Sequence, residues 1–398
     1  MSADKQNHLN TCLNLIRDWL LNSGIQNVDG RQDIIGGFNS WYDPEKKLYP
    51  YIYSEITGYG ITTLLYFYSI SGEKLFLDRA ELAANWLINS ALHHHGAVST
   101  RFYYPHVSTA DPYSSQEETL VAFDNGTVIF GVCKLYQITG KKKYLHFAQK
   151  IGEFLLDLQR PNYSIYAIYN YKTKEKVDTP VKWSTQTGAF HAKVAMGLWE
   201  LYQICKKRRF LEASKMLCEH SLLFQTESGR FITFRDTGFS HAHPHCYTAE
   251  GLLFIGYKTG NNLFIKAAYE ATKWLMAQQE NNGGISSIYF NKSEHNHYQR
   301  SDAIAQITRL VNILTGLRFR FPQLDSRNSK FVKRILEFQK IDPDKIRIHG
   351  GLRFGQDEDG NSYPHINSWC SMFAFQALAS YLNRHDKNAV HKVLDFLV

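Results

Sequence analysis

The sequence predicts an all-α protein folded as an (α/α)6 toroid, a single domain that spans residues 1–398. Two observations carry this prediction: a short motif that recurs along the chain, and the hydrophobic pattern on either side of each copy. The motif combines a small residue, a polar turn and an aromatic residue, and it occurs at residues 71–76, 139–144, 205–210 and 259–264. Internal repeats of this length indicate an architecture built from copies of one supersecondary unit.

Each copy of the motif separates an apolar stretch from an amphipathic one, which predicts a helical hairpin. Glycine adopts the left-handed conformation that ends a helix, so Thr-Gly followed by lysines is typical of one helix ending and the next beginning. The wholly apolar helix must be buried, and the amphipathic helix must cover it. After the second copy, apolar residues recur at helical spacing, namely Tyr144, Phe147, Ile151, Phe154 and Leu158.

Two further hairpins are predicted at residues 304–339 and 369–398, and an opening helix near residues 8–22. Six hairpins that close into a ring form an inner and an outer layer of helices. An open solenoid is the alternative, but long irregular connections disfavour it. Connections of such length are uncommon unless they build a functional surface, so we expect them to gather at one mouth of the ring. They lie at residues 103–119, 159–183 and 285–301.

Composition narrows the classes of function. The chain is 44% hydrophobic and 21% charged, which allows a substantial core and excludes a disordered chain. Its formal net charge of +8 favours acidic partners, among them nucleic acid, anionic lipid and acidic sugars. The basic runs at residues 141–143 and 206–209 both fall on the repeated turn, so we interpret them as solvated turns and predict no nucleic-acid binding.

The cysteines and the N-terminal residues predict a cytoplasmic protein. None of the six cysteines forms a C-x-x-C pair, which favours free thiols in a reducing compartment. Residues 1–10 are polar and lack the apolar core of a secretory signal. No run approaches eighteen apolar residues, so no membrane span is expected. The sequence does not predict the oligomeric state.

Polar and ionisable residues mark the predicted start of every inner helix. Since all six helices would begin at the same mouth, these side chains would face one cavity. The segments are residues 53–59, 123–127, 183–187, 241–247, 301–306 and 365–369. We expect no cofactor, because the chain has no phosphate-binding loop, no dinucleotide fingerprint and no nucleophile elbow.

Three carboxylates lie in these segments, Glu55, Asp124 and Asp302. Two carboxyl groups facing each other across a sugar divide the acid and base, or acid and nucleophile, roles of glycoside cleavage. Partial burial raises the pKa of a carboxyl group, which suits a general acid. The alternative for Asp124 and Asp302 is helix capping, whereas glutamate is a poor cap. We therefore predict catalytic roles for Glu55 and Asp124 and a substrate-binding role for Asp302.

Histidines form two groups. His241, His243 and His245 alternate with small residues and Pro244, so the segment reads as extended, with all three side chains on one face. A metal site there stays open, but no specific metal-binding pattern is present, and we expect proton transfer or hydrogen bonding by His243 rather than metal binding. Residues 93–95 are interpreted as a solvated cationic cluster at a helix end.

The chain is 14% aromatic, and most of these residues are expected to pack between helices. Flat side chains at the helix starts would stack on the apolar faces of sugar rings. The candidate substrate-binding residues are therefore five aromatic and three polar ones, Tyr53, Tyr59, Trp183, Tyr247, Trp369, Asp302, Gln306 and Asn367.

These motifs resemble those of a group of six-hairpin, (α/α)6-toroid proteins of bacterial surface-polysaccharide biosynthesis, over roughly residues 50–380. Its Tyr-Pro-Glu-x-Thr-Gly-Tyr signature is similar to residues 53–59, with Ser54 in place of proline, and its Phe-Asp-Thr-Gly-x-Val-x-Phe-Gly signature is similar to residues 123–131. Its His-x-x-x-Tyr-x-x-x-Gly-Leu-Leu signature falls on His243, Tyr247 and residues 251–253. Only Ala305-Gln306 remains of its Gly-Asn-Ala-Gln element, and Asn367 and Trp369 approximate its final motif.

The resemblance extends distantly to unsaturated-glucuronyl hydrolases, which implies a catalytic Asp124, and to N-acylglucosamine 2-epimerases. It implies a carbohydrate substrate, with uronic acid as one candidate. The leading hypothesis is a glycoside hydrolase-like enzyme in which Glu55 and Asp124 act as acid and base and His243 and Tyr247 assist. The alternatives are a sugar epimerase or lyase that uses His and Tyr, and a glycan-binding protein without catalysis.

Overall fold

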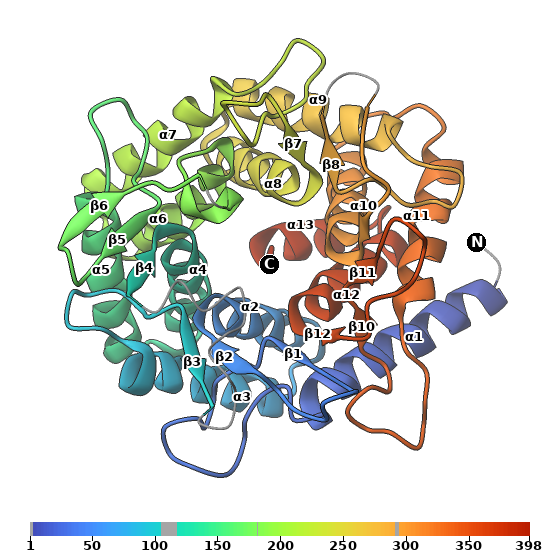
Figure 1. Ribbon diagram of the computed structural model, residues 1–398, viewed down its shortest axis with the longest axis horizontal. Helices are drawn as coiled ribbons and strands as arrows, with labels where there is room; N and C mark the ends of the chain where they lie inside the picture. The colour runs from blue at the N-terminus through green and yellow to red at the C-terminus, as the bar shows by residue number, and fades with distance from the viewer. Residues whose placement is uncertain (1–2, 105–117, 181, 291–293) are drawn as a thin grey trace.

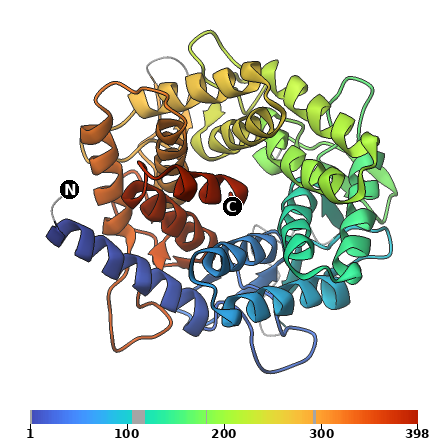
Figure 2. The ribbon, with the colours of Figure 1, turned by 180° about the vertical axis from the view of Figure 1, so that it is seen from behind.

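The computed structural model describes residues 3–104, 118–180, 182–290 and 294–398. In this part of the chain thirteen α-helices are present, and twelve of them form two concentric layers around one axis (Figures 1 and 2). The inner helices are α2 (Ser54–Ser71), α4 (Ala122–Thr139), α6 (Ala192–Cys205), α8 (Ala242–Thr259), α10 (Ser301–Gly316) and α12 (Ser368–Leu382). The outer helices are α1 (Ala3–Asn22), α3 (Lys74–Trp86), α5 (Lys142–Asp157), α7 (Arg208–Leu222), α9 (Asn262–Ala277) and α11 (Leu324–Phe338). Contacts between α12 and α2 close the ring, which confirms the (α/α)6 toroid.

The turns between paired helices have the expected geometry. Gly72, Gly140 and Gly260 cap α2, α4 and α8 with φ between 67° and 74°, the left-handed region that glycine adopts without a steric penalty. Lys206 takes the same conformation in the third copy of the motif, with φ of 56°. The repeated motif is therefore a helix end, as the sequence indicates.

Helix pairing differs from the prediction at the point where the ring closes. The outer partner of α12 is α1, from the other end of the chain. The helix that follows α12 is α13 (Lys387–Asp395), which contacts α2, α10 and α12 and lies within the ring (Figure 1). The predicted sixth hairpin at residues 369–398 is therefore wrong in its second helix, because α13 fills the centre of the toroid.

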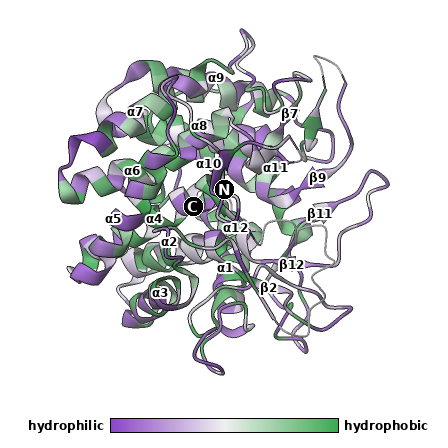
Figure 3. Cartoon of the chain, turned by 60° about the vertical axis from the view of Figure 1, so that its left-hand side comes forward, coloured by the Kyte–Doolittle hydropathy of each residue, from purple (hydrophilic) through white to green (hydrophobic). Residues whose placement is uncertain are grey.

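Burial separates the two layers. Every residue of α2 from Ser54 to Phe67 is buried, whereas α5 buries only the face that carries Tyr144, Phe147 and Ile151. Figure 3 shows the corresponding alternation of hydrophilic and hydrophobic residues along α5 and α7. In the described residues no helix is both long enough and apolar enough to cross a membrane.

Glycines let neighbouring inner helices approach closely. A Cβ atom at Gly251 of α8 would lie 2.1 Å from the carbonyl oxygen of Ala192 on α6. A Cβ atom at Gly197 of α6 would lie 2.4 Å from the carbonyl oxygen of Gly126 on α4. Both distances are too short for any side chain, so these glycines set the inner diameter of the ring.

Short strands gather on one side of the ring, the side that faces the viewer in Figure 1. Five of the inner helices begin directly after a strand, and only α6 follows a 3-10 turn, η4 (Ala189–His191). Residues at these junctions therefore converge on one mouth. Of the connection predicted at residues 103–119, residues 105–117 lie outside the described residues. The five strands are β2 (Tyr51–Tyr53), β4 (Thr119–Val121), β7 (Ser240–His241), β9 (Gln299–Arg300) and β12 (Ile366–Asn367).

The remaining strands pair antiparallel with these or with each other in small sheets, of which the largest have three strands. Tyr53 faces Arg101 across the β2–β3 pair, and Asn367 faces both Trp41 and Leu352. The sheets thereby hold side chains from distant segments beside the helix starts. These strands are β1 (Trp41–Tyr42), β3 (Arg101–Tyr103), β5 (Ile168–Asn170), β6 (Glu175–Val177), β8 (Ile288–Tyr289), β10 (Leu352–Arg353) and β11 (Gly355–Gln356).

A buried ionic network lies inside the ring. Glu250 of α8 binds Lys193 of α6 at 2.9 Å and Arg309 of α10 at 3.0 Å. Lys193 also donates to the main-chain oxygen of Val398 at 3.0 Å, and Arg309 donates to Gln376 of α12 at 3.0 Å. Buried charges are tolerated when they are paired and hydrogen-bonded. The network ties four inner helices to the segment after α13.

Candidate functional site

The mouth of the ring opens into a cavity of about 590 Å³. This volume lies within the usual range of small-molecule sites. Its lining comes from the helix starts and from the strands that precede them, as the position of polar residues in the sequence predicts. Nine aromatic side chains line it, namely Trp41, Tyr51, Tyr53, Trp183, Phe234, Tyr247, Phe354, Tyr363 and Trp369.

The aromatic residues form two walls. On one side Trp183 packs edge-on against His243, with ring centroids 5.7 Å apart, and Tyr247 lies 4.3 Å from the same imidazole. On the other side Trp41 lies edge-on to Trp369 at 6.5 Å. Of these side chains Trp41, Trp183 and Trp369 are half-exposed, and they offer flat stacking surfaces to a ring-shaped ligand.

Among the described residues, Glu55 is the only carboxylate that lines the cavity, and Asp124 lies beside it. Burial raises the pKa of Glu55 to about 7, although the neighbouring hydroxyl groups of Tyr53 and Tyr59 act in the opposite direction. Burial and the charge of Glu55 raise the pKa of Asp124 well above its usual range. The two groups therefore compete for ionisation, and both hold their protons to a higher pH than isolated carboxyl groups do.

Asp124 occupies a different place from the one expected. It is 2% exposed and does not line the cavity, so the two carboxyl groups are neighbours on adjacent helices and do not face each other across the cavity. Its Oδ2 atom is buried and has no hydrogen-bond partner among the described residues. A buried polar atom without a partner is uncommon, and a role in catalysis is one explanation for it.

Neither aspartate is the N-cap residue of its helix, although Oδ1 of Asp302 accepts the backbone N–H of Ala303 in the first turn at 2.6 Å. The N-cap residues of α4 and α10 are Val121 and Arg300, and neither makes a side-chain capping bond. Asp302 is fully buried and binds the Arg300 guanidinium at 2.5 and 3.0 Å and the indole N–H of Trp369 at 2.9 Å. Although burial acts in the opposite direction, the Arg300 charge holds the pKa of Asp302 below its usual range. Asp302 thus orients two residues of the cavity wall.

His243 is fixed by a chain of hydrogen bonds. Its Nδ1 atom lies 2.7 Å from Oε1 of Gln306, whose Nε2 atom donates to Glu250 at 3.4 Å. Because a carboxylate can only accept hydrogen bonds, Glu250 faces the amide nitrogen of Gln306, and the Gln306 oxygen therefore faces His243. That oxygen is also an acceptor, so Nδ1 of His243 carries the proton. Burial lowers the pKa of His243 to about 4, so the ring is neutral near pH 7.

The other imidazole nitrogen, Nε2, has no hydrogen-bond partner among the described residues, and His243 lines the cavity. The tautomer deduced above leaves an unprotonated lone pair on this atom. The arrangement therefore provides a base within the cavity.

The three histidines of this segment do not form one face. The segment is extended only as far as His241, and α8 begins at Ala242. His241 accepts the backbone N–H of His243 and caps the helix, whereas His245 bonds to the carbonyl oxygen of Ala271 on the outer helix α9. The expectation of an extended segment with three parallel imidazoles is wrong, because positions two apart on a helix point in different directions.

Tyr59 and Tyr247 meet below the cavity. Their hydroxyl groups form a hydrogen bond of 2.8 Å between α2 and α8, which stand opposite each other in the ring. Both rings are 1% exposed, and Tyr59 does not line the cavity. Of the other residues predicted to bind substrate, Tyr53, Trp183, Tyr247, Asn367 and Trp369 line the cavity, whereas Gln306 and Asp302 lie behind it.

Sequence reasoning missed the cations of the cavity. Arg101, Arg300 and Lys182 line it. Arg101 lies over the Tyr51 ring at 5.0 Å, and Arg300 over the Phe354 ring at 4.6 Å. Arg300 could have been found from the sequence, because it directly precedes a predicted inner helix. Arg101 sits on a three-residue strand that has no pattern of its own.

The fold and the cavity place the chain among the six-hairpin, glycosidase-like toroids. The sequence model of glycosyl hydrolase family 47 matches residues 35–317, and the chain belongs to this family. No curated protein sequence matches the chain significantly.

Solved structures of the same fold are similar over almost the whole chain. A sugar epimerase from a ruminal bacterium has a TM-score of 0.74 at 10% identity, over 94% of this chain and 98% of its own. Cellobiose 2-epimerase from Spirochaeta thermophila has a TM-score of 0.74 at 14% identity, over 96% and 97%. An unsaturated glucuronyl hydrolase specific for heparin has a TM-score of 0.63 at 13% identity, over 94% and 96%. At these identities the likeness concerns the fold.

Proposed function

We propose that the protein is a glycoside hydrolase that cleaves an acidic oligo- or polysaccharide within the cavity at the mouth of the ring. The observation that carries the proposal is Glu55, a cavity-lining carboxyl group whose pKa is raised to about 7 by burial. Such a group retains its proton near neutral pH and donates it to the oxygen of a departing sugar. Membership of a glycosyl hydrolase family supports the same reaction.

The cleavage needs an acid and a base on opposite sides of the bond. Glu55 stands on α2 and His243 on α8, across the ring from each other. In the proposed reaction Nε2 of His243 takes a proton from water, the water oxygen bonds to the anomeric carbon, and the glycosidic C–O bond breaks. Glu55 protonates the leaving oxygen. Asp124, which lies behind Glu55, acts by keeping that proton available.

Charge supports an acidic substrate. Arg101, Arg300 and Lys182 line the cavity, and the N-terminal ends of the inner helices point toward the same mouth, where their dipoles favour anions. Arg300 is paired with Asp302, and the three cations together favour a substrate that carries a carboxylate. A uronic acid has this charge. A place in polysaccharide biosynthesis stays a prediction from the sequence motifs.

The test is a panel of 4-nitrophenyl glycosides, uncharged and uronate, together with acidic oligosaccharides assayed for new reducing ends. Glu55→Gln is expected to abolish turnover, and the exposed Glu73→Gln serves as its matched control. Arg101→Gln is expected to raise KM for uronates while leaving KM for uncharged glycosides unchanged. Full activity of a folded Glu55→Gln variant would overturn the assignment.

A second candidate is epimerisation of a free sugar, and the neutral imidazole of His243 favours it. An imidazole Nε2 that is already unprotonated also removes a proton from a carbon beside a carbonyl group, with the phenol of Tyr247 beside it. Reactions in deuterated water separate the two candidates. Epimerisation introduces deuterium at carbon, and hydrolysis introduces none. Binding of acidic oligosaccharides without any product would instead identify a glycan-binding protein.

A further inference from the structure

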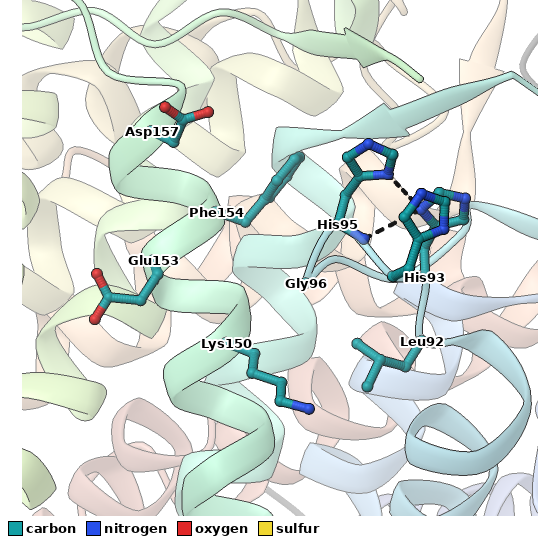
Figure 4. A pocket seen from close by; sticks show the side chains of 9 residues that line it. Leu92, His93, His95, Gly96, Lys150, Glu153, Phe154 and Asp157 are labelled. Atoms are coloured by element: carbon teal, nitrogen blue, oxygen red, sulfur yellow. Dashed lines mark hydrogen bonds between the residues drawn. The ribbon is translucent and has the colours of Figure 1, made fainter. Parts of the chain in front are cut away.

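A second hollow, of about 720 Å³, lies on the outside of the ring, away from the cavity (Figure 4). One side is the turn that follows a π-helical segment, η1 (Leu87–Ala91), and the other side is helix α5. Three consecutive histidines, His93, His94 and His95, stand on the turn. Their imidazoles pack against one another, with His94 exposed and His93 and His95 half-buried.

The imidazoles converge. One ring nitrogen from each of the three lies within 4.8 Å of the others, and the Nδ1 atoms of His93 and His95 are 2.9 Å apart. Nitrogen ligands held at about 2.0–2.1 Å from one zinc ion stand roughly 3.3–3.5 Å from each other in tetrahedral geometry. The Nδ1 atoms of His93 and His95, which share a hydrogen bond in this structure, are therefore already close to the spacing that a shared ion requires, and a nitrogen of His94 lies within 4.8 Å of both.

The backbone of the turn is held by several contacts. The N–H of His93 donates to the carbonyl oxygen of Ala97 at 2.7 Å, and that of Gly96 donates to the carbonyl oxygen of His93 at 3.0 Å. Tyr171, which directly follows β5, packs against His93, and Tyr169 of β5 packs against His95, with ring centroids 4.7 and 5.1 Å apart. Single π-helical turns such as η1 occur frequently at functional sites.

The acidic residues of the hollow are engaged elsewhere. Glu153 pairs with Arg209, and Asp157 pairs with Lys176 at 2.8 Å. The donor set offered by the turn is therefore imidazole alone, which suits zinc, copper and nickel and does not suit magnesium or calcium. The open side of the hollow gives an ion a path to the histidines.

We propose that His93, His94 and His95 bind one divalent transition-metal ion of the zinc class, with water completing the coordination. The site is separate from the cavity, but residues that follow the turn contact residues next to Asp124 and Glu55. Val98, which follows the turn, donates its N–H to Asn125 beside Asp124 at 2.8 Å, and the carbonyl oxygen of Thr100 accepts the N–H of Ser54 beside Glu55. The bound ion would hold the turn from which β3 carries Arg101 into the cavity.

A second histidine group provides a matched control. Glu280, His295 and His297 also lie within 4.8 Å of one another. Their donors are engaged with protein groups, since Glu280 accepts from Ser286 and Gln299 at 2.8 and 2.7 Å and His295 bonds to Ser286 at 2.9 Å. We expect this group to bind zinc more weakly than the turn does.

The experiment is a calorimetric titration of metal-free protein without an affinity tag, using zinc chloride. One zinc ion per chain is expected for the wild type. The double variant His93→Gln/His95→Gln is expected to bind at least about tenfold more weakly, because loss of a supporting partner alone often costs ~10–100-fold. The control variant His295→Gln/His297→Gln is expected to bind like the wild type.

Three results would overturn the proposal: no zinc uptake by the wild type, unchanged binding by the first variant, or loss of binding confined to the control variant. Far-ultraviolet circular dichroism of each variant shows that it is folded. Zinc is also expected to raise the Tm of the wild type and of the control variant, and to leave that of His93→Gln/His95→Gln unchanged.

Discussion

The side-chain amide of Gln306 joins His243 to Glu250, with its oxygen 2.7 Å from Nδ1 of the imidazole and its nitrogen 3.4 Å from the carboxylate. Glu250 is fully buried and held by Lys193 and Arg309. A charge network deep in the ring thus determines which nitrogen of a cavity histidine carries the proton.

Replacement of Gln306 by methionine is expected to release this tautomer. The variant keeps similar volume but neither accepts from His243 nor donates to Glu250, so the share of the tautomer protonated at Nδ1 is expected to fall, with the Asp302 carboxylate 3.6 Å away as the remaining group that favours it. The measurement is the ¹⁵N chemical shifts of His243, which differ between protonated and unprotonated nitrogens. Gln137→Met is the control, because Gln137 donates to another buried carboxylate, Glu200, at 2.8 Å. Unchanged shifts in Gln306→Met would contradict the relay.

Glu55 is expected to make stability depend on pH. Its pKa is about 7 in the folded chain, above the unfolded value of about 4.3. Its contribution to stability is therefore fully present below about pH 4.3 and is lost as the pH rises through 7, by roughly 4 kcal/mol in total. Thermal unfolding is expected to show that Glu55→Gln loses less stability than the wild type over this range. Parallel curves for the two proteins would rule the shift out.

Asp302→Asn is expected to destabilise the protein strongly. Asp302 is fully buried against Arg300, and its removal leaves a guanidinium without its partner in the cavity wall. Breaking a buried ion pair in this way costs about 3–5 kcal/mol, as urea denaturation would measure. Asp78→Asn, which breaks an exposed pair with Lys74, is the matched control and is expected to cost about 0.5 kcal/mol. Equal effects of the two substitutions would show that the buried pair is not a stabilising contact.

Gly251→Ala is expected to force α8 away from α6. The added methyl group would meet the carbonyl oxygen of Ala192 at 2.1 Å, and backbone atoms cannot move aside as a flexible side chain does. Overpacking of this kind costs about 1–3 kcal/mol, and we expect a corresponding fall in Tm. A Tm equal to that of the wild type would mean that the two helices separate without strain.

The helical hairpins were predictable because their signals are local. The period of Tyr144, Phe147 and Ile151 and the glycine caps at residues 72, 140 and 260 depend on neighbouring residues only. The pairing of α1 with α12 was not predictable in this way. It joins the two ends of the chain, and no local pattern distinguishes an outer helix from α13, which is also amphipathic.

In the candidate site, too, residues with a local sequence signal were predictable, and residues placed by pairing between distant segments were not. Glu55, His243 and Trp369 were found because polar residues at the start of an apolar helix stand out in sequence. Arg101 was missed because a strand of three residues carries no pattern, and its place beside Tyr53 comes from pairing between segments 48 residues apart, as the register of β2 and β3 shows. The prediction for His245 failed because the helix begins at Ala242, three residues before it.

The hydrogen bond between Tyr59 and Tyr247 has a consequence for the length of substrate that the ring accepts. It links opposite inner helices, and α13 with the ionic network of Glu250 fills the ring interior, so the cavity is a blind pocket rather than a tunnel. A polysaccharide cannot thread through such a ring. On the proposed function, the chain is engaged by one end, and the enzyme removes terminal residues instead of cutting at internal positions.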